Sequence, residues 1–249
     1  MQRCRRIAAG RGEPGDVLLD GAHLITDALA AGVPLAGVLG TERALAALSI
    51  GTGHHFPCYT AAEDVVDAAS PVRSPSGVVA VASWRPQPVA PLLDVPDAAI
   101  VGLVGVQDPG NVGTIIRSAD ALGGSGVVVL EGTADPGGWK ALRGAMGSTF
   151  RIPIATGAAT DVLAAARARR VRVAATVASG GAALDTRALA PPLLVLIGSE
   201  GTGLPPALIE QADTRVTVPM RSRVNSLNAA TTASLVLWEL TRPARESRQ

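Results

Sequence analysis

The sequence predicts an α/β protein with a parallel sheet, preceded by a smaller α/β unit. Two observations predict it. From residue 98 onward, short apolar runs alternate with helical segments, as in a parallel sheet that helices cover on both faces. Upstream, residues 84–96 contain four prolines, which favour a linker. With 249 residues available, we expect a domain over residues 1–85, a Pro-rich linker over 86–97 and a second domain over 98–249.

The first domain is predicted from short strands and capped helices. A strand at 17–19 precedes a helix at 21–31, which Gly32 and Pro34 end. A second strand follows at 38–39. Thr41 and Thr60 are expected to cap helices at 42–48 and 61–69, and a strand at 78–82 completes the unit.

The second domain repeats the alternation of strand and helix. Strands are expected at residues 100–104, 126–130, 171–176, 193–197 and 215–218. Helices are expected at residues 111–122, 161–170, 205–211 and 227–240. Gly123 and Gly124 end the first of these helices, and Asn111 is its expected cap.

Composition narrows the possible functions. Hydrophobic residues make up 47% and charged residues 17%, which excludes a disordered chain. A net charge of +1 indicates neither nucleic acid nor a membrane as a binding partner. Aromatic residues supply only 2%, which disfavours stacking of bases on aromatic rings. Because Lys140 is the only lysine, the positive charge is almost wholly arginine, a residue suited to phosphate.

Several classes of protein are disfavoured by what the sequence lacks. Its longest apolar stretch, residues 188–199, is shorter than the ~18 residues that span a bilayer, so no membrane segment is expected. Cys4 and Cys58, without an apolar leader, favour a reducing cytoplasm over a secreted scaffold. The three histidines have no cysteine or acid at metal-ligand spacing, so no metal is expected.

Three loops at predicted strand ends carry the candidate chemistry, since ligands of parallel sheets bind beyond the carboxyl ends of strands. Residues 106–113 read VQDPGNVG and lead to Arg117, residues 196–205 read LIGSEGTGLP, and residues 218–228 read VPMRSRVNSLN. Each loop also has a simpler interpretation. The first can be a strand–turn–helix junction with a solvated arginine, the second an exposed turn that carries a carboxylate, and the third a set of helix caps. The dinucleotide motif G-x-G-x-x-G and the phosphate-binding P-loop are both absent.

Together the three loops resemble the SpoU/TrmH-type branch of the SPOUT RNA methyltransferases. The resemblance rests on N-x-G-x-x-x-R at 111–117, I-G-S-E-G-x-G-L at 197–204, and V-P-M followed by N-S-L-N at 218–228, and it runs from residue 100 to 240. More weakly, residues 17–83 are similar to a small ribosomal-protein-like RNA-binding domain, through residues 20–24 and 76–81.

The resemblance implies a C-terminal trefoil knot, a homodimer, S-adenosylmethionine as cofactor and methylation of a ribose 2′-hydroxyl in RNA. The implied cofactor-binding residues are Leu196, Gly198, Gly201, Val218, Met220 and Leu227. The implied catalytic residues are Asn111, Arg117, Glu200, Ser226 and Asn228.

The chemistry of methyl transfer assigns more specific roles to the implied catalytic residues. A guanidinium group carries a permanent positive charge in proteins, so we expect Arg117 to bind phosphate and stabilise the developing alkoxide, which leaves the proton acceptor open. Glu200 would orient Arg117 or Asn111, and Ser226 with Asn228 would hold the third loop.

RNA contacts are expected from arginines, against the alternative that these are solvated charges: Arg3, Arg5, Arg6, Arg11, Arg73, Arg221 and Arg223. Ribosomal RNA is the preferred substrate because of the first domain. The alternative substrate is transfer RNA, and a further possibility is a self-protection enzyme that methylates ribosomal RNA against an antibiotic. The alternative functions are an RNA-binding module without catalysis and a dinucleotide-dependent oxidoreductase. The RNA and the nucleotide methylated stay open.

Overall fold

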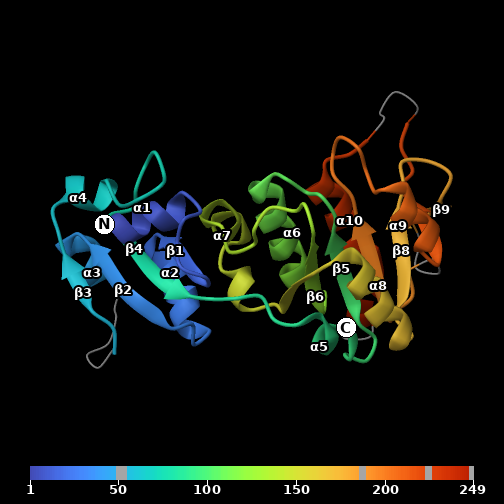
Figure 1. Cartoon of the computed structure of the whole chain (residues 1–249), viewed down its shortest axis with the longest axis horizontal. Coiled ribbons are helices and arrows are strands. Elements are labelled where there is room, and N and C mark those ends of the chain that lie inside the picture. Colours follow the sequence, from blue (N-terminus) through green and yellow to red (C-terminus); the bar gives the residue numbers. More distant parts are fainter. Residues whose placement is uncertain (49–54, 185–188, 222–225, 247–249) are drawn as a thin grey trace. The chain divides into compact units, whose positions relative to one another are not determined.

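A computed structural model describes residues 1–48, 55–184, 189–221 and 226–246, with side chains described up to residue 242 (Figure 1). The chain divides into two compact units. Unit 1 comprises Met1–Arg85 and Asp135–Arg151, and unit 2 comprises Pro86–Ala134 and Ile152–Gln249. The predicted boundary near residue 85 is therefore one of three points at which the chain passes between units.

Unit 1 contains a four-stranded mixed sheet in the order β1-β4-β2-β3. Its strands are β1 (Asp16–Asp20), β2 (Leu35–Gly40), β3 (Cys58–Thr60) and β4 (Val78–Ser83). The central strand β4 runs antiparallel to β1 and β2, whereas β3 runs parallel to β2. The helices are α1 (Gln2–Ala8), α2 (Ala22–Ala30), α3 (Glu42–Ala47), α4 (Glu63–Asp67) and α7 (Trp139–Ala145), and a 3₁₀ turn, η1, covers Ser148–Phe150.

The segment 135–151 belongs to unit 1 because of its apolar side chains. Leu142 of α7 is fully buried and packs in the same core as Leu19 of β1 and Ile25 of α2. The sequence places this segment in the second domain, since strands 126–130 and 171–176 enclose it. A short helix with one large buried leucine carries too little periodicity to reveal which sheet it covers.

The two predicted threonine caps have different outcomes. Thr41 accepts a hydrogen bond from the Ala44 backbone N–H at 3.2 Å and caps α3, as expected. The prediction for Thr60 is wrong, because Thr60 ends β3 and α4 begins at Glu63.

Unit 2 contains a seven-stranded sheet in the order β7-β6-β5-β10-β8-β11-β9, and every pair in it is parallel. The strands are β5 (Ala99–Leu103), β6 (Gly126–Leu130), β7 (Ile154–Gly157), β8 (Arg172–Thr176), β9 (Ala182–Ala183), β10 (Leu193–Ile197) and β11 (Thr214–Thr217). The helices are α5 (Val89–Leu93), α6 (Pro109–Leu122), α8 (Ala159–Ala168), α9 (Pro206–Gln211) and α10 (Ala229–Glu246). The predicted parallel α/β sheet is confirmed.

The strand order reverses at the centre of this sheet. From β5 the chain builds outward through β6 and β7, and β10 then returns to pair with β5 on one side and β8 on the other. All residues of β5, β6 and β10 are buried, which agrees with their unbroken apolar sequences. Ligands bind at such a reversal, beyond the carboxyl ends of the strands.

The Pro-rich segment 86–97 differs from the linker that the sequence predicts. It contains α5, and Leu92 and Leu93 of that helix are buried in the core of unit 2. Pro91 is tolerated because it is the third residue of α5, where a backbone N–H has no partner within the helix. No helix among the described residues is long and apolar enough to cross a membrane.

The packing of α5 can be tested by shortening one leucine. Leu92 is 1% exposed, so Leu92→Ala is expected to lower the free energy of unfolding by about 2 to 5 kcal/mol, measured by denaturant titration. The matched control is Val95→Ala, since Val95 is 38% exposed and its loss is expected to cost less than about 0.5 kcal/mol. Equal effects of the two changes would contradict a structural role for this segment.

Candidate functional site

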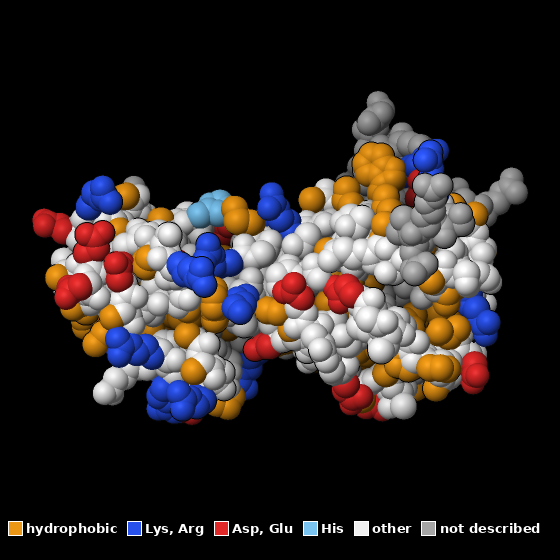
Figure 2. Space-filling view, turned by 90° about the horizontal axis from the view of Figure 1, so that it is seen from above, with side chains coloured by type: hydrophobic (Ala, Val, Ile, Leu, Met, Phe, Trp, Pro, Cys, Tyr) orange, Lys and Arg blue, Asp and Glu red, His pale blue; other side chains and the backbone are white. Residues whose placement is uncertain are grey.

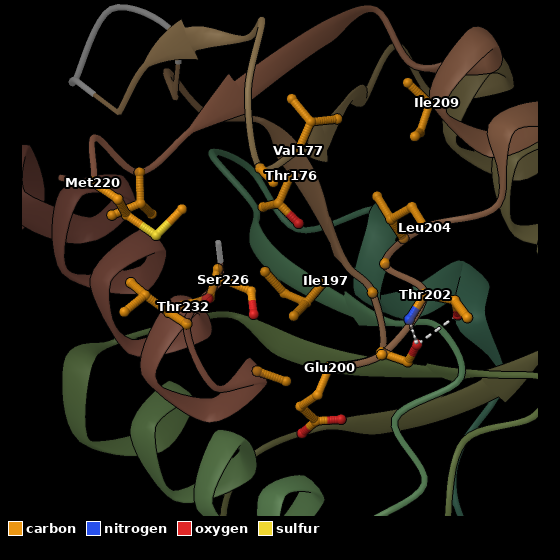
Figure 3. Close-up of a pocket in the computed structure, with 18 residues that line it drawn as sticks. Thr176, Val177, Ile197, Glu200, Thr202, Leu204, Ile209, Met220, Ser226 and Thr232 are labelled. Atoms are coloured by element: carbon orange, nitrogen blue, oxygen red, sulfur yellow. Dashed lines mark hydrogen bonds between the residues drawn. The ribbon is translucent and has the colours of Figure 1, made fainter. Parts of the chain in front are cut away.

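A cavity of about 410 Å³ lies beyond the carboxyl ends of three neighbouring strands of unit 2, next to the start of α10 (Figure 3). Its walls come from the segments that follow β8, β10 and β11. They comprise Thr176, Val177, Ala178, Ile197, Gly198, Ser199, Glu200, Gly201, Thr202, Gly203, Leu204, Ile209, Val218, Met220, Ser226, Leu227, Ala229 and Thr232. Among the described residues that line the cavity, Glu200 is the one ionisable side chain.

The loop after β10 folds back tightly on itself. A Cβ atom on Gly198 would overlap the backbone of Gly203 and Leu204, so only glycine fits at position 198. The Gly203 N–H donates to the Ser199 carbonyl at 3.0 Å, and the Ser199 and Thr202 hydroxyls lie 2.9 Å apart (Figure 3). These contacts hold the loop backbone against the cavity.

A chain of amide and carboxylate groups joins the three predicted loops. The Asn111 side-chain N–H donates to the Glu200 carboxylate, and the Asn228 side-chain N–H donates to the Asn111 Oδ1 at 3.1 Å. The Asn228 Oδ1 in turn accepts the backbone N–H groups of Ala230 and Thr231, at 2.9 and 3.2 Å, and so caps the start of α10. Because both ends of the Asn111 carboxamide are engaged, its orientation is determined.

The cap of α6 corrects one sequence interpretation. Asp108, not Asn111, accepts the N–H of Gly110 at 2.8 Å and caps the helix, while Asn111 lies in its first turn. This arrangement leaves the Asn111 side chain available for contacts outside its own helix. The sequence leaves open whether Glu200 contacts Arg117 or Asn111, and the structure shows the contact with Asn111.

Arg117 lies farther along α6 and is exposed. Among the described residues it has no hydrogen bond or ion pair, and it does not line the cavity. The structure therefore brings Asn111, Glu200 and Asn228 into contact and places Ser226 at the cavity wall, with Arg117 apart from them on the same helix as Asn111.

Five of the six expected cofactor residues line the cavity: Gly198, Gly201, Val218, Met220 and Leu227. The exception is Leu196, whose side chain is buried in the core of unit 2 while its carbonyl accepts the Thr176 hydroxyl at 2.8 Å. Sequence reasoning missed Thr176 and Val177. Their position could have identified them, because Thr176 is the last residue of β8 and Val177 follows it, at the edge of the sheet where ligands bind.

The expected RNA-contacting arginines of the N-terminus lie on or beside α1, and three of them have partners within unit 1. Arg3 donates to Asp16 at 2.7 and 3.0 Å, and this bond lowers the pKa of the Asp16 carboxyl. Arg5 donates to the Ala68 carbonyl at 2.7 Å, and Arg6 lies 3.5 Å from Glu13.

Three of the remaining expected RNA contacts are exposed. Arg11, Arg73 and Arg221 are exposed, and Arg223 lies outside the described residues. Within the part of the chain that the structure describes, no group of three or more His, Cys, Asp or Glu side chains is arranged to hold a metal ion.

Comparisons with known proteins agree with this site. Residues 98–238 match the SpoU rRNA Methylase family. The chain is 31% identical over 223 residues to the 23S rRNA (guanosine(2553)-2′-O)-methyltransferase RlmP of Bacillus subtilis, which covers 90% of this chain and 87% of that protein.

Two solved structures are similar over nearly the whole chain. One is an AdoMet-bound rRNA methyltransferase from Sinorhizobium meliloti, with a TM-score of 0.84, 31% identity, and 97% of this chain and 94% of that one covered. The other is the SpoU methyltransferase AviRb from Streptomyces viridochromogenes in complex with AdoMet, with a TM-score of 0.84, 27% identity and 98% of both chains covered. As its three loop motifs predict, the chain belongs to the SpoU rRNA methylase family.

Proposed function

We propose that this chain transfers a methyl group from S-adenosylmethionine to a ribose 2′-hydroxyl of ribosomal RNA. The observation that carries the proposal is the contact of Asn111 with Glu200 and Asn228 beside a cavity at the centre of the sheet. The predicted enzyme class and cofactor are confirmed, since the relatives include a 23S rRNA 2′-O-methyltransferase and AdoMet-bound enzymes of the same fold.

The cavity fits the cofactor in size and in the chemistry of its walls. Its volume of about 410 Å³ lies within the range of small-molecule sites. Val218, Met220 and Leu227 supply apolar surface, and Gly198 and Gly201 let a ligand approach the backbone of the loop after β10. When bound there, S-adenosylmethionine supplies a methyl group on a positively charged sulfur.

The reaction needs little covalent help from the protein. With S-adenosylmethionine bound, the ribose 2′-oxygen would form a bond to the methyl carbon as the carbon–sulfur bond breaks, the sulfur would leave as a neutral thioether, and the hydroxyl proton would be released to solvent. Alignment of the two reactants therefore dominates. Asn111 is suited to align the ribose, because Glu200 and Asn228 hold its amide. Its second side-chain N–H has no partner among the described residues and is available to the RNA.

Arg117 acts as a charge and not as a base. A guanidinium group has no lone pair with which to accept a proton, and that of Arg117 has no internal partner within the described part of the chain. It binds a phosphate of the RNA and stabilises negative charge that develops on the 2′-oxygen.

The finer architecture is part of the proposal. The C-terminal segment forms a trefoil knot, which the position of β10 between β5 and β8 supports. The enzyme works as a homodimer, because α10 exposes Leu235 and Trp238, which are 39% and 51% exposed, one helical turn apart. Unit 1 is the RNA-binding domain, and a ribosomal RNA substrate implies a cytoplasmic enzyme.

The reaction and the role of Arg117 can be tested together. The wild-type protein is expected to transfer tritiated methyl groups to an unmodified 23S rRNA transcript, with mass spectrometry locating a 2′-O-methylribose. Arg117→Ala should lower turnover by about 10²- to 10³-fold and leave cofactor affinity in calorimetry unchanged. Arg167→Ala, which removes an exposed arginine from α8, is the control. Equal turnover of wild type and Arg117→Ala would contradict the role, and methylation of transfer RNA alone would contradict the substrate.

Two substitutions of Glu200 distinguish the effect of its negative charge from the effect of its hydrogen bond with Asn111. Glu200→Gln keeps a carbonyl oxygen that can accept the Asn111 N–H, so it should retain most of the turnover. Glu200→Ala removes the acceptor and should lower kcat by about 10- to 100-fold. If both variants are equally impaired in the methyl-transfer assay, the negative charge is what matters.

The tight loop after β10 gives a prediction for stability. Gly198→Ala forces the loop apart and should lower the free energy of unfolding by about 1 to 3 kcal/mol and weaken cofactor binding. Gly201→Ala in the same loop is the control, since a Cβ there meets nothing within 4 Å and should cost less than about 0.5 kcal/mol. Denaturant titration and calorimetry measure the two effects, and similar unfolding energies for both variants would contradict this account.

A further inference from the structure

The segment 135–151 brings net positive charge into unit 1. It carries Lys140, Arg143 and Arg151 against one acidic residue, Asp135. On the face of unit 1 seen in Figure 2, acidic side chains gather at the end near α3 and α4. Farther along the same face, Lys or Arg side chains gather beside a histidine.

Arg143 is exposed on α7 and close to one half-buried carboxyl group, that of Asp20. Burial has the largest effect on the pKa of Asp20 and raises it, while the hydrogen bond from Ser70 and, more weakly, the charge of Arg143 lower it. Asp20 accepts a hydrogen bond from the Ser70 hydroxyl at 2.5 Å, whereas Arg143 forms no hydrogen bond or 4 Å ion pair with any described residue. Its guanidinium thus feels the Asp20 charge without a direct bond to any described residue, and its N–H groups can bind an anion.

Lys140 and Trp139 extend the charged surface along α7. Lys140 is exposed one turn before Arg143, and its ammonium lies 5.4 Å from the centroid of the partly exposed Trp139 ring. Cations next to an exposed aromatic ring suit RNA, because phosphates bind the cations and a base can stack on the ring.

Contacts of Arg151 and Gly147 hold the segment 135–151 against α2. Arg151 lies 3.5 Å from Asp27 of α2 and donates to the Ser148 hydroxyl at 3.0 Å, while Asp27 also lies 3.4 Å from His23. Gly147 has a φ of 80° and touches the Asp27 carboxylate so closely that a side chain would collide with it. Arg151 and Asp27 thus compensate each other, and Lys140 and Arg143 keep their charge for a partner.

We propose that Trp139, Lys140 and Arg143 form an RNA-binding surface of unit 1, which we call the α7 surface. The two cations bind successive phosphates, and the indole stacks on a base. The arginines of α1 are less suited, since Arg3 and Arg6 already face Asp16 and Glu13. This assignment rests on the proposed function, because it assumes that unit 1 receives RNA.

Salt dependence of RNA binding tests the α7 surface. Binding of an unmodified 23S rRNA transcript to full-length protein is measured from about 50 to 200 mM salt, where each phosphate contact on single-stranded RNA contributes a slope of about 0.7. The variant Lys140→Ala/Arg143→Ala should lower the slope by about 1 to 1.5. It should also raise the KM for RNA and leave kcat and cofactor affinity unchanged. The control Arg6→Ala/Arg11→Ala removes two charges from the same unit.

The outcomes separate this inference from the proposed function. A wild type that methylates RNA, with a reduced slope in the α7 variant and an unchanged slope in the control, supports the α7 surface. A wild type that methylates RNA, with an unchanged slope in the α7 variant or an equal loss in the control, overturns it. A wild type that transfers no methyl group contradicts the proposed function instead. Lys140→Gln/Arg143→Gln, which removes both charges but keeps polar side chains longer than alanine, should reproduce the effect of the alanines.

Discussion

The site depends on how the carboxamide of Asn111 is held. Glu200 accepts from its nitrogen and Asn228 donates to its oxygen, so three loops from distant parts of the sequence meet at one planar group. A carboxamide held at both ends cannot rotate without breaking a hydrogen bond, and this makes it a precise guide for a hydroxyl group. Asn228 also caps α10, which links the orientation of Asn111 to the start of the last helix.

The sheet makes this meeting possible. Because β10 pairs between β5 and β8, the loops after β5 and β10 leave the sheet at the same edge and next to each other. The apolar sequences of these strands bury them on both faces, so the loops stand on a rigid base. Because the loop after β10 turns tightly at Gly198, Glu200 lies at the wall of the cavity only a few residues after the strand ends.

Much of this is predictable from the sequence, and the failures have physical reasons. The motifs of Asn111, Glu200 and Asn228 follow predicted strands and so point to the site, whereas the choice between Asp108 and Asn111 as a cap requires coordinates. Leu196 is predicted to bind the cofactor because it opens the correct loop motif, yet strand alternation turns its side chain into the core. Pro91 obscures α5 because a proline in a first helical turn looks the same in sequence as a helix breaker.

The three passages of the chain between units have a consequence for how the protein is made. Unit 1 begins at the N-terminus but completes its core only with Leu142, more than fifty residues after β4 ends. During synthesis, β5, α6 and β6 of unit 2 emerge before the first unit is closed. The apolar surface that awaits Leu142 is thus uncovered while the catalytic sheet starts to form, so the two units cannot mature strictly one after the other.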